Sequence, residues 1–133
     1  MDVDELRRLP PLAGLSEVGL QRLSLRAAEL QASAGRVLAL EGDAGAGMFI
    51  LCDGSVEVEL RSGKLELGQG DFFGELALLV DDGARVARVR ATTDVRCISI
   101  PRDDFLALVE TEPSFALHML RELARRLAEA RAV

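Results

Sequence analysis

The sequence contains a single histidine, His118, and only two cysteines, Cys52 and Cys97, which are far apart in the chain. One imidazole cannot build the several-histidine site of metal-binding barrels, and the two cysteines lack the close spacing of zinc ligands. No serine, cysteine, histidine and aspartate pattern indicates a nucleophile with its base. We therefore expect neither a metal centre nor an enzyme, and we interpret His118 as a residue on a helix face.

Long apolar runs and an excess of positive charge are also missing. No stretch has the length to span a membrane, and no secretory signal opens the chain. The formal net charge is -6, which argues against a nucleic-acid partner for this chain alone. Both cysteines lie in short apolar runs typical of reduced core thiols, and the sequence leaves a disulfide between them open. We expect a cytoplasmic protein without a membrane partner.

The hydrophobic pattern along the 133 residues changes from helix to strand and back to helix. Asp4 to Leu9 predicts a short helix, and Ser16 caps a second helix of about 12 residues whose apolar spacing runs to Leu30. Short strands punctuated by glycines follow, and a short helix after Pro101 precedes a long one that begins at Pro113. The strands are predicted at 36–41, 48–52, 55–60, 64–67, 85–91 and 95–100.

This order of elements predicts one domain of the mainly β class with flanking helices, because many short strands at even spacing are typical of a small sandwich or barrel. We place N-terminal helices in residues 1–34, the β-barrel in 35–101 and C-terminal helices in 102–133. The composition, 49% hydrophobic and 29% charged, is that of a globular chain large enough for one core.

The strongest functional signal is the segment 70–79, which reads GDFFGELALL, followed by Arg85. Gly74 allows a sharp turn or a close approach to a ligand. The run 76–79 is long enough for one helical turn, whose first N–H groups and dipole suit an anion. Arg85 adds a permanent charge with a planar fork of donors that fits phosphate. Glu75 beside a phosphate needs another partner, such as a sugar hydroxyl, so the segment indicates a nucleotide.

The pattern Phe73-Gly74-Glu75-Leu76-Ala77-Leu78, with an arginine ten residues after the glutamate, resembles the phosphate-binding cassette of the cyclic nucleotide-binding domain family. Residues 84–91 match the second half of that cassette in part. Residues 35–43 and 48–58 are similar to two early hairpins of the family. The resemblance covers nearly the whole chain, and it implies a jelly-roll β-barrel flanked by helices, with the cassette at 70–91.

The resemblance also implies roles for the cassette residues. The cyclic phosphate would lie against the N–H groups of Leu76 and Ala77 and would pair with Arg85. Glu75 would accept a hydrogen bond from the ribose 2′-hydroxyl, and Gly74 would give the backbone room.

Outside the cassette, Val58 and Leu67 fall where the family lines the purine pocket with apolar side chains. The segment 123–127 of the last helix resembles the part that covers the base in catabolite-activator-type members. By that match Arg126 would reach Glu75 or the ribose. The alternative is a solvated arginine on a charged helix face.

Three positions depart from the family pattern. Val86 replaces the small residue that follows the phosphate arginine. Arg88 stands where many members carry threonine or serine, so it either adds a second cation to the phosphate or points into solvent. Ala130 and Arg131 replace polar residues that read adenine in some members. These departures leave the choice of base open.

Two functions of different classes follow. The first is a cyclic nucleotide sensor, with cAMP expected before cGMP because cAMP is the common ligand of bacterial relatives, and with binding coupled to movement of the last helix. The second is a degenerate barrel that binds no nucleotide and serves as a dimerisation or docking module. Val86 and Arg88 motivate the second, and the intact Glu75 and Arg85 argue against it. No cofactor besides the ligand is expected, and the partners implied are a second copy through the last helix or an effector domain in a longer protein.

Overall fold

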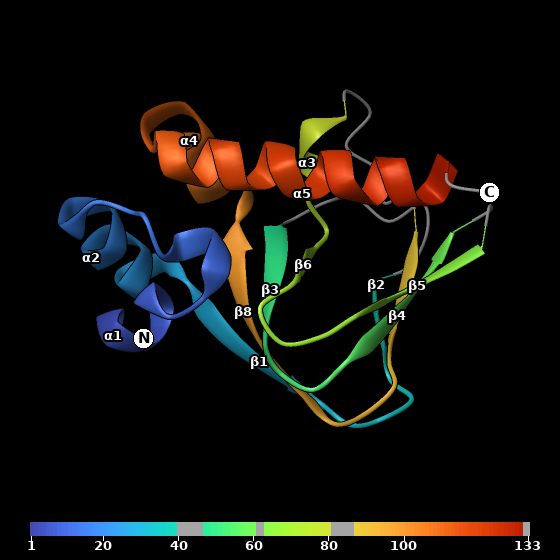
Figure 1. The fold of residues 1–133 in the computed structure, drawn as a ribbon. Helices are drawn as coiled ribbons and strands as arrows, with labels where there is room; N and C mark the ends of the chain where they lie inside the picture. Colours follow the sequence, from blue (N-terminus) through green and yellow to red (C-terminus); the bar gives the residue numbers. More distant parts are fainter. Residues whose placement is uncertain (40–46, 61–62, 81–86, 132–133) are drawn as a thin grey trace.

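Two antiparallel four-stranded sheets form a barrel with helices at both ends of the chain (Figure 1). The computed structural model describes residues 1–39, 47–60, 63–80 and 87–131. The first sheet has the order β1 (Ala28–Ala32), β8 (Val95–Pro101), β3 (Gly47–Asp53) and β6 (Phe72–Phe73). The second has the order β2 (Val37–Ala39), β7 (Arg88–Ala91), β4 (Val56–Leu60) and β5 (Gly63–Leu67). The helices are α1 (Val3–Arg7), η1 (Pro10–Leu12), α2 (Glu17–Arg26), α3 (Leu76–Leu79), α4 (Arg102–Thr111) and α5 (Pro113–Arg131).

The strand β3 in the first sheet is buried on both of its faces, which explains why it is a nearly continuous apolar run. Successive side chains of a strand point to opposite faces. Met48, Ile50 and Cys52 pack in one core cluster with the helices, whereas Leu51 and Cys97 pack in a second cluster inside the barrel. The two cysteines therefore belong to opposite faces of the sheet and are not joined.

Most of the predicted elements are confirmed, and the boundaries of the barrel strands agree to within one residue at 47–53, 56–60, 63–67 and 95–101. Ser16 caps α2 by accepting a hydrogen bond from the N–H of Gly19 at 3.0 Å. Of the predicted strands 36–41 and 85–91, the structure shows 37–39 and 88–91; residues 40–46 and 81–86 lie outside the described part of the chain.

The prediction that residues 1–34 are helical is wrong at its end. α2 stops at Arg26, and Ala27 has the extended ψ of 145° that starts β1. Leu30, which fitted the helical spacing, lies opposite Cys97 in the ladder between β1 and β8. Pairing with a long neighbouring strand prevails here over local periodicity, because the strand satisfies its backbone groups and covers the barrel interior at once. The two-residue strand β6 was not predicted, since no pattern can be read in two residues.

Arg96 ties the N-terminal helix to the first sheet. Its guanidinium forms ion pairs with Glu5 of α1, with Glu29 of β1 at 3.2 Å and with Asp53 of β3 at 3.2 Å. Replacing Arg96 by alanine leaves three carboxylates close together, and we expect the free energy of unfolding to fall by about 1–2 kcal/mol because the group is partly exposed. Urea unfolding measures this loss. The exposed Arg102 on α4 is the control, and an equal loss in Arg102→Ala would contradict the role given to Arg96.

The two thiols are expected to be unreactive in the native protein. Burial raises the pKa of Cys52 and, with a contribution from Cys52, raises the pKa of Cys97 to about 12. Because the thiolate is the nucleophile and the pKa of Cys97 lies far above pH 8, very little of this thiol is reactive at that pH. An aromatic disulfide reagent should therefore label two thiols per chain in denaturant and essentially none in buffer. Rapid labelling of the native chain would contradict the burial of either residue.

Candidate functional site

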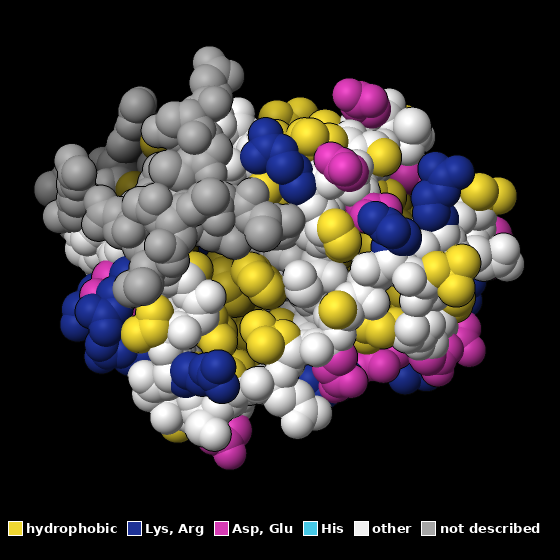
Figure 2. All heavy atoms as spheres, turned by 180° about the vertical axis from the view of Figure 1, so that it is seen from behind, with side chains coloured by type: hydrophobic (Ala, Val, Ile, Leu, Met, Phe, Trp, Pro, Cys, Tyr) yellow, Lys and Arg dark blue, Asp and Glu magenta, His cyan; other side chains and the backbone are white. Residues whose placement is uncertain are grey.

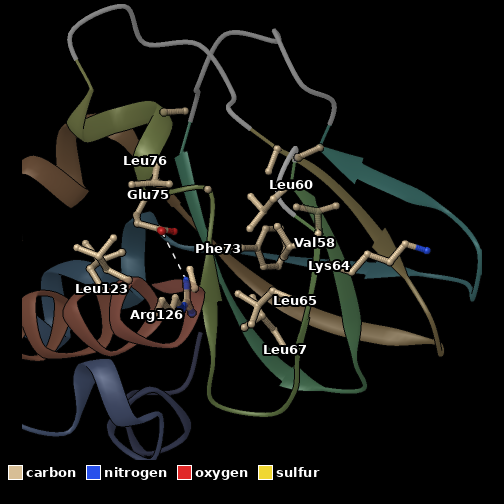
Figure 3. A pocket seen from close by; sticks show the side chains of 18 of the residues that line it. Val58, Leu60, Lys64, Leu65, Leu67, Phe73, Glu75, Leu76, Leu123 and Arg126 are labelled. Atoms are coloured by element: carbon tan, nitrogen blue, oxygen red, sulfur yellow. Dashed lines mark ion pairs between the residues drawn. The ribbon is translucent and has the colours of Figure 1, made fainter. Parts of the chain in front are cut away.

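A cavity of about 680 Å³ lies between the second sheet, the turn of α3 and the helix α5. Figure 3 shows that side chains from these elements point into it. The strand alternation produces its wall, because Val58 and Leu67 point inward while their neighbours Glu57 and Glu66 are on the outer face. The apolar residues of the lining are Ala39, Val58, Leu60, Leu65, Leu67, Phe73, Leu76, Ala77, Ala87, Val89, Leu123, Leu127 and Ala130.

The cassette reaches the cavity through a glycine turn. Phe72 and Phe73 are buried in β6, and the Phe73 ring stacks on Phe49 with centroids 5.0 Å apart. Gly74 then has a φ of +90°, a conformation that side-chain-bearing residues rarely adopt. The turn directs Glu75 and the start of α3 toward the cavity, which Leu76 and Ala77 line.

Glu75 and Arg126 meet at the edge of the cavity, although they are distant in sequence (Figure 3). Glu75 is only 3% exposed. Its Oε1 lies 3.5 Å from Nη1 of Arg126, whose side chain is 12% exposed. The guanidinium also lies 4.4 Å from the centre of the Phe72 ring. An acid and a base buried together beside an apolar cavity form a polar contact point for a ligand of mixed character.

Two further groups hold the guanidinium of Arg126 on the barrel. Its Nη2 donates to the backbone carbonyl of Phe72 at 2.7 Å, and its Nε donates to Oε1 of Glu122 at 3.2 Å. The hydrogen bond from Arg125 lowers the pKa of Glu122, burial opposes this, and the charge of Arg126 adds to the lowering. α5 is thus fastened over the cavity by a charged side chain in the half of the helix nearer its C-terminus.

Residues 29–112 match the sequence profile described as cyclic nucleotide-binding domain. The chain belongs to the cyclic nucleotide-binding domain family. The fold predicted from the sequence, a jelly-roll barrel with flanking helices, is confirmed by the two antiparallel sheets and by the solved structures that resemble it.

The relatives of this cyclic nucleotide-binding domain include a receptor protein and a potassium channel. The chain is 35% identical over 102 residues to the cyclic AMP receptor protein of Thermus thermophilus. This alignment covers 72% of this chain and 47% of the relative. It is 40% identical over 83 residues to a cyclic nucleotide-gated potassium channel of Rhizobium etli. That alignment covers 62% of this chain and 23% of the channel. The crystal structure of the Thermus thermophilus catabolite activator protein matches with a TM-score of 0.73 and 29% identity over 91% of this chain and 59% of that chain. The chain spans less than half the length of these two curated relatives.

The structure brings together most of the residues predicted for the cyclic nucleotide site. The residues that line one cavity are Gly74, Glu75, Leu76, Ala77, Val58, Leu67 and Arg126. The alternative interpretation of Arg126, a solvated side chain on a charged helix face, is wrong. Its side chain is largely buried and contacts Glu75, Glu122 and the Phe72 carbonyl. Arg85 and Val86 lie outside the described residues, so their predicted roles stay predictions.

Of the two alternatives for Arg88, a second cation at the site is wrong, and the structure has the side chain on the outer face of the barrel, 38% exposed. Arg88 alternates with Val89, and it is Val89 that points into the cavity. Arg88 stands opposite Glu59 on the outer face of the sheet, and its Nη1 lies 3.9 Å from Oε2 of Glu59. Strand alternation therefore excludes the guanidinium from the barrel interior.

Sequence reasoning missed Phe73, Glu122 and the carbonyl of Phe72 as parts of the site. A backbone carbonyl leaves no signal in a sequence. Glu122 did leave one, since it lies four residues before Arg126 and the two share a helix face. That spacing is typical of an ion pair on the surface of a helix, whereas the side chain of Glu122 is only 17% exposed.

One face of the domain shows mixed charge among the described residues. Seen from behind, basic and acidic side chains are interspersed with hydrophobic ones (Figure 2). Among the described residues, no helix has both the length and the apolarity needed to cross a membrane.

Proposed function

We propose that this domain is a cyclic nucleotide sensor that binds cAMP in preference to cGMP and couples binding to the position of α5. The observation that carries the proposal is the buried pair of Glu75 and Arg126 at the edge of a large apolar cavity, directly beside the cassette turn. A nucleotide needs an apolar wall for its base and polar groups for its sugar and phosphate, and this cavity presents both.

The family pattern supplies a pose that fits these groups. The purine would lie against Val58 and Leu67, and the ribose 2′-hydroxyl would donate to the carboxylate of Glu75. The cyclic phosphate would lie at the turn of Leu76 and Ala77 and would pair with Arg85.

Two observations support cAMP over cGMP. Curated relatives include a cyclic AMP receptor protein, and their cAMP-binding character comes to this chain as part of the proposal. Arg88 offers no hydroxyl at the position where many family members carry threonine or serine, a hydroxyl that in some members contacts guanine. The site would therefore lack that contact to guanine.

Coupling to α5 follows from the position of Arg126. This side chain belongs to α5 and contacts Glu75 inside the barrel, so a ligand that engages Glu75 changes what holds the helix. A ligand can shift the balance between helix positions only by its difference in affinity for them. The ligand-bound and ligand-free chains should therefore differ in how firmly α5 is held.

Titration calorimetry with both cyclic nucleotides tests the proposal on the native chain and on Arg85→Ala. We expect cAMP to bind more tightly than cGMP, and we expect Arg85→Ala to weaken binding by roughly tens-fold, since a charge-assisted hydrogen bond contributes about 1.5–3 kcal/mol. Ligand at about one hundred times its dissociation constant should raise the free energy of unfolding by about 2.7 kcal/mol. No heat and no thermal shift with millimolar cAMP or cGMP would reject the sensor.

A second copy of the chain is the partner that α5 favours. Leu117, Leu120 and Leu127 are 45%, 66% and 54% exposed, and with the exposed Ala124 they follow a spacing of three and four residues along the helix. Such spacing is typical of a helix that pairs with another helix. Analytical ultracentrifugation of the native chain and of Leu120→Glu tests this role. The native chain should sediment as a dimer and Leu120→Glu as a monomer. A native chain that sediments as a monomer would reject the pairing.

A further inference from the structure

The guanidinium of Arg126 is held from three directions, and the three contacts differ in length. The hydrogen bond to the Phe72 carbonyl is 2.7 Å, the one to Glu122 is 3.2 Å, and the nearest approach to Glu75 is 3.5 Å. The two shorter contacts are made with groups outside the proposed ribose contact. The orientation of Arg126 is therefore set chiefly by Phe72 and Glu122, and Glu75 meets a guanidinium that is already placed.

Glu122 suits this role because of its position on α5. It lies one turn before Arg126 on the same face of the helix, and its side chain is 17% exposed, whereas that of Glu129 on the same helix is 56% exposed. Its carboxylate also accepts hydrogen bonds from Arg125, which in turn forms an ion pair with Glu129. These ion pairs form a series of alternating charge, in the order Glu129, Arg125, Glu122, Arg126 and Glu75.

A long flexible side chain needs such a support to act at a defined point. Arginine has many rotamers, and fixing one of them costs conformational entropy. The Phe72 ring restricts the plane of the guanidinium, and Glu122 fixes the Nε side. Without Glu122, one backbone carbonyl and one ring face would remain to hold Arg126 when Glu75 turns to a ligand.

We propose that Glu122 is a positioning residue for ribose recognition: it holds Arg126 in the orientation in which the guanidinium meets Glu75, and so it keeps the Glu75 carboxylate aimed at the 2′-hydroxyl. The inference rests on the proposed function, in which Glu75 accepts from that hydroxyl. It assigns to a second acid, on a different element from the cassette, a share in discriminating ribose from deoxyribose.

The test compares cAMP with 2′-deoxy-cAMP on the native chain, on Glu122→Gln and on the control Glu110→Gln, which changes an exposed acid of α4. We expect Glu122→Gln to reduce the preference for the ribose ligand by about tenfold, the size of one hydrogen bond to a charged group. Glu110→Gln should keep the native preference. If Glu122 only stabilises the helix, both ligands weaken by the same factor and the proposal is overturned.

A measurement without ligand separates this inference from the proposed function. The Arg126 Nε–H, observed by nitrogen-15 NMR in the native chain, should exchange slowly with water because Glu122 accepts it. In Glu122→Gln that exchange should accelerate by about tenfold or more, since the charged acceptor is lost. Unchanged exchange would overturn the positioning role even if nucleotides bind. Absence of nucleotide binding by the native chain would reject the proposed function and leave this result to decide the role of Glu122.

If Glu122→Gln fails to fold, Glu122→Asp replaces it in both measurements. The shorter side chain keeps the charge but withdraws the carboxylate from Nε of Arg126, so the same two changes are expected. Native behaviour of Glu122→Asp in both measurements would overturn the proposal.

Discussion

Glu75→Gln is expected to weaken the binding of cAMP by about 10- to 150-fold, which corresponds to the 1.5–3 kcal/mol of a hydrogen bond to a charged group. Glutamine has nearly the same shape, so the cavity keeps its form while the carboxylate charge is lost. The ribose hydroxyl would then meet a neutral acceptor, and Arg126 would lose one of its two acidic partners. Titration calorimetry at constant salt measures the loss.

The matched control for this change is Glu66→Gln, which neutralises an exposed acid on the outer face of β5. Its affinity for cAMP should equal that of the native chain within about twofold, because exposed charges at this distance are screened by salt. The ligand 2′-deoxy-cAMP should bind native chain and Glu75→Gln about equally. A large loss with the deoxy ligand as well would show that Glu75 acts through the fold rather than through the hydroxyl.

Phe115→Ala is expected to lower the free energy of unfolding by about 3–5 kcal/mol, the usual cost of removing a buried aromatic side chain and leaving a cavity. Phe115 lies in the first turn of α5 and is fully buried. Its ring meets that of Phe105 on α4 edge to face, with centroids 5.8 Å apart and planes at 77°. This contact joins the two C-terminal helices to the helix-side core. Chemical denaturation followed by far-ultraviolet circular dichroism measures the loss.

A loss of that size is a large part of the stability of an ordinary domain, so Phe115→Leu provides a milder variant with an expected cost of at most about 1.5 kcal/mol. Leu25→Ala is the control, because Leu25 is 87% exposed on α2 and its removal should change stability by no more than about 0.5 kcal/mol. A cost for Phe115→Ala near that of Leu25→Ala would mean that the α4–α5 junction does not depend on this ring.

Local pattern accounts for most of the elements and for the cassette. Val56 and Val58 alternate with Glu57 and Glu59 in the sequence, and the structure has both valines inside the barrel. Ser16 predicts the start of α2 by its chemistry alone. These features depend on neighbours in sequence, and so they can be read from it.

The predictions from sequence fail where a partner distant in the sequence decides which conformation a segment adopts or which way a side chain points. Residues 28–32 have a spacing that fits both a helix and a strand, and the ladder with β8 selects the strand. Arg88 stands where many family members carry threonine or serine, but the register of β7 turns it outward. A shift of one residue in register moves a side chain to the other face, and no short stretch of sequence contains that information.

The amino-acid sequence by itself determined the family and the class of fold, because both depend on short spacings of glycine, acid and apolar residues. Only the tertiary structure decided that Arg126 is buried, that Glu122 and the Phe72 carbonyl hold it, and that Arg88 lies outside. The physical reason is that a long charged side chain is stable inside a protein only where several partners converge on it. Glu122 lies on the same helix as Arg126, but the Phe72 carbonyl and Glu75 lie about 50 residues away in the sequence, and only folding brings them to it.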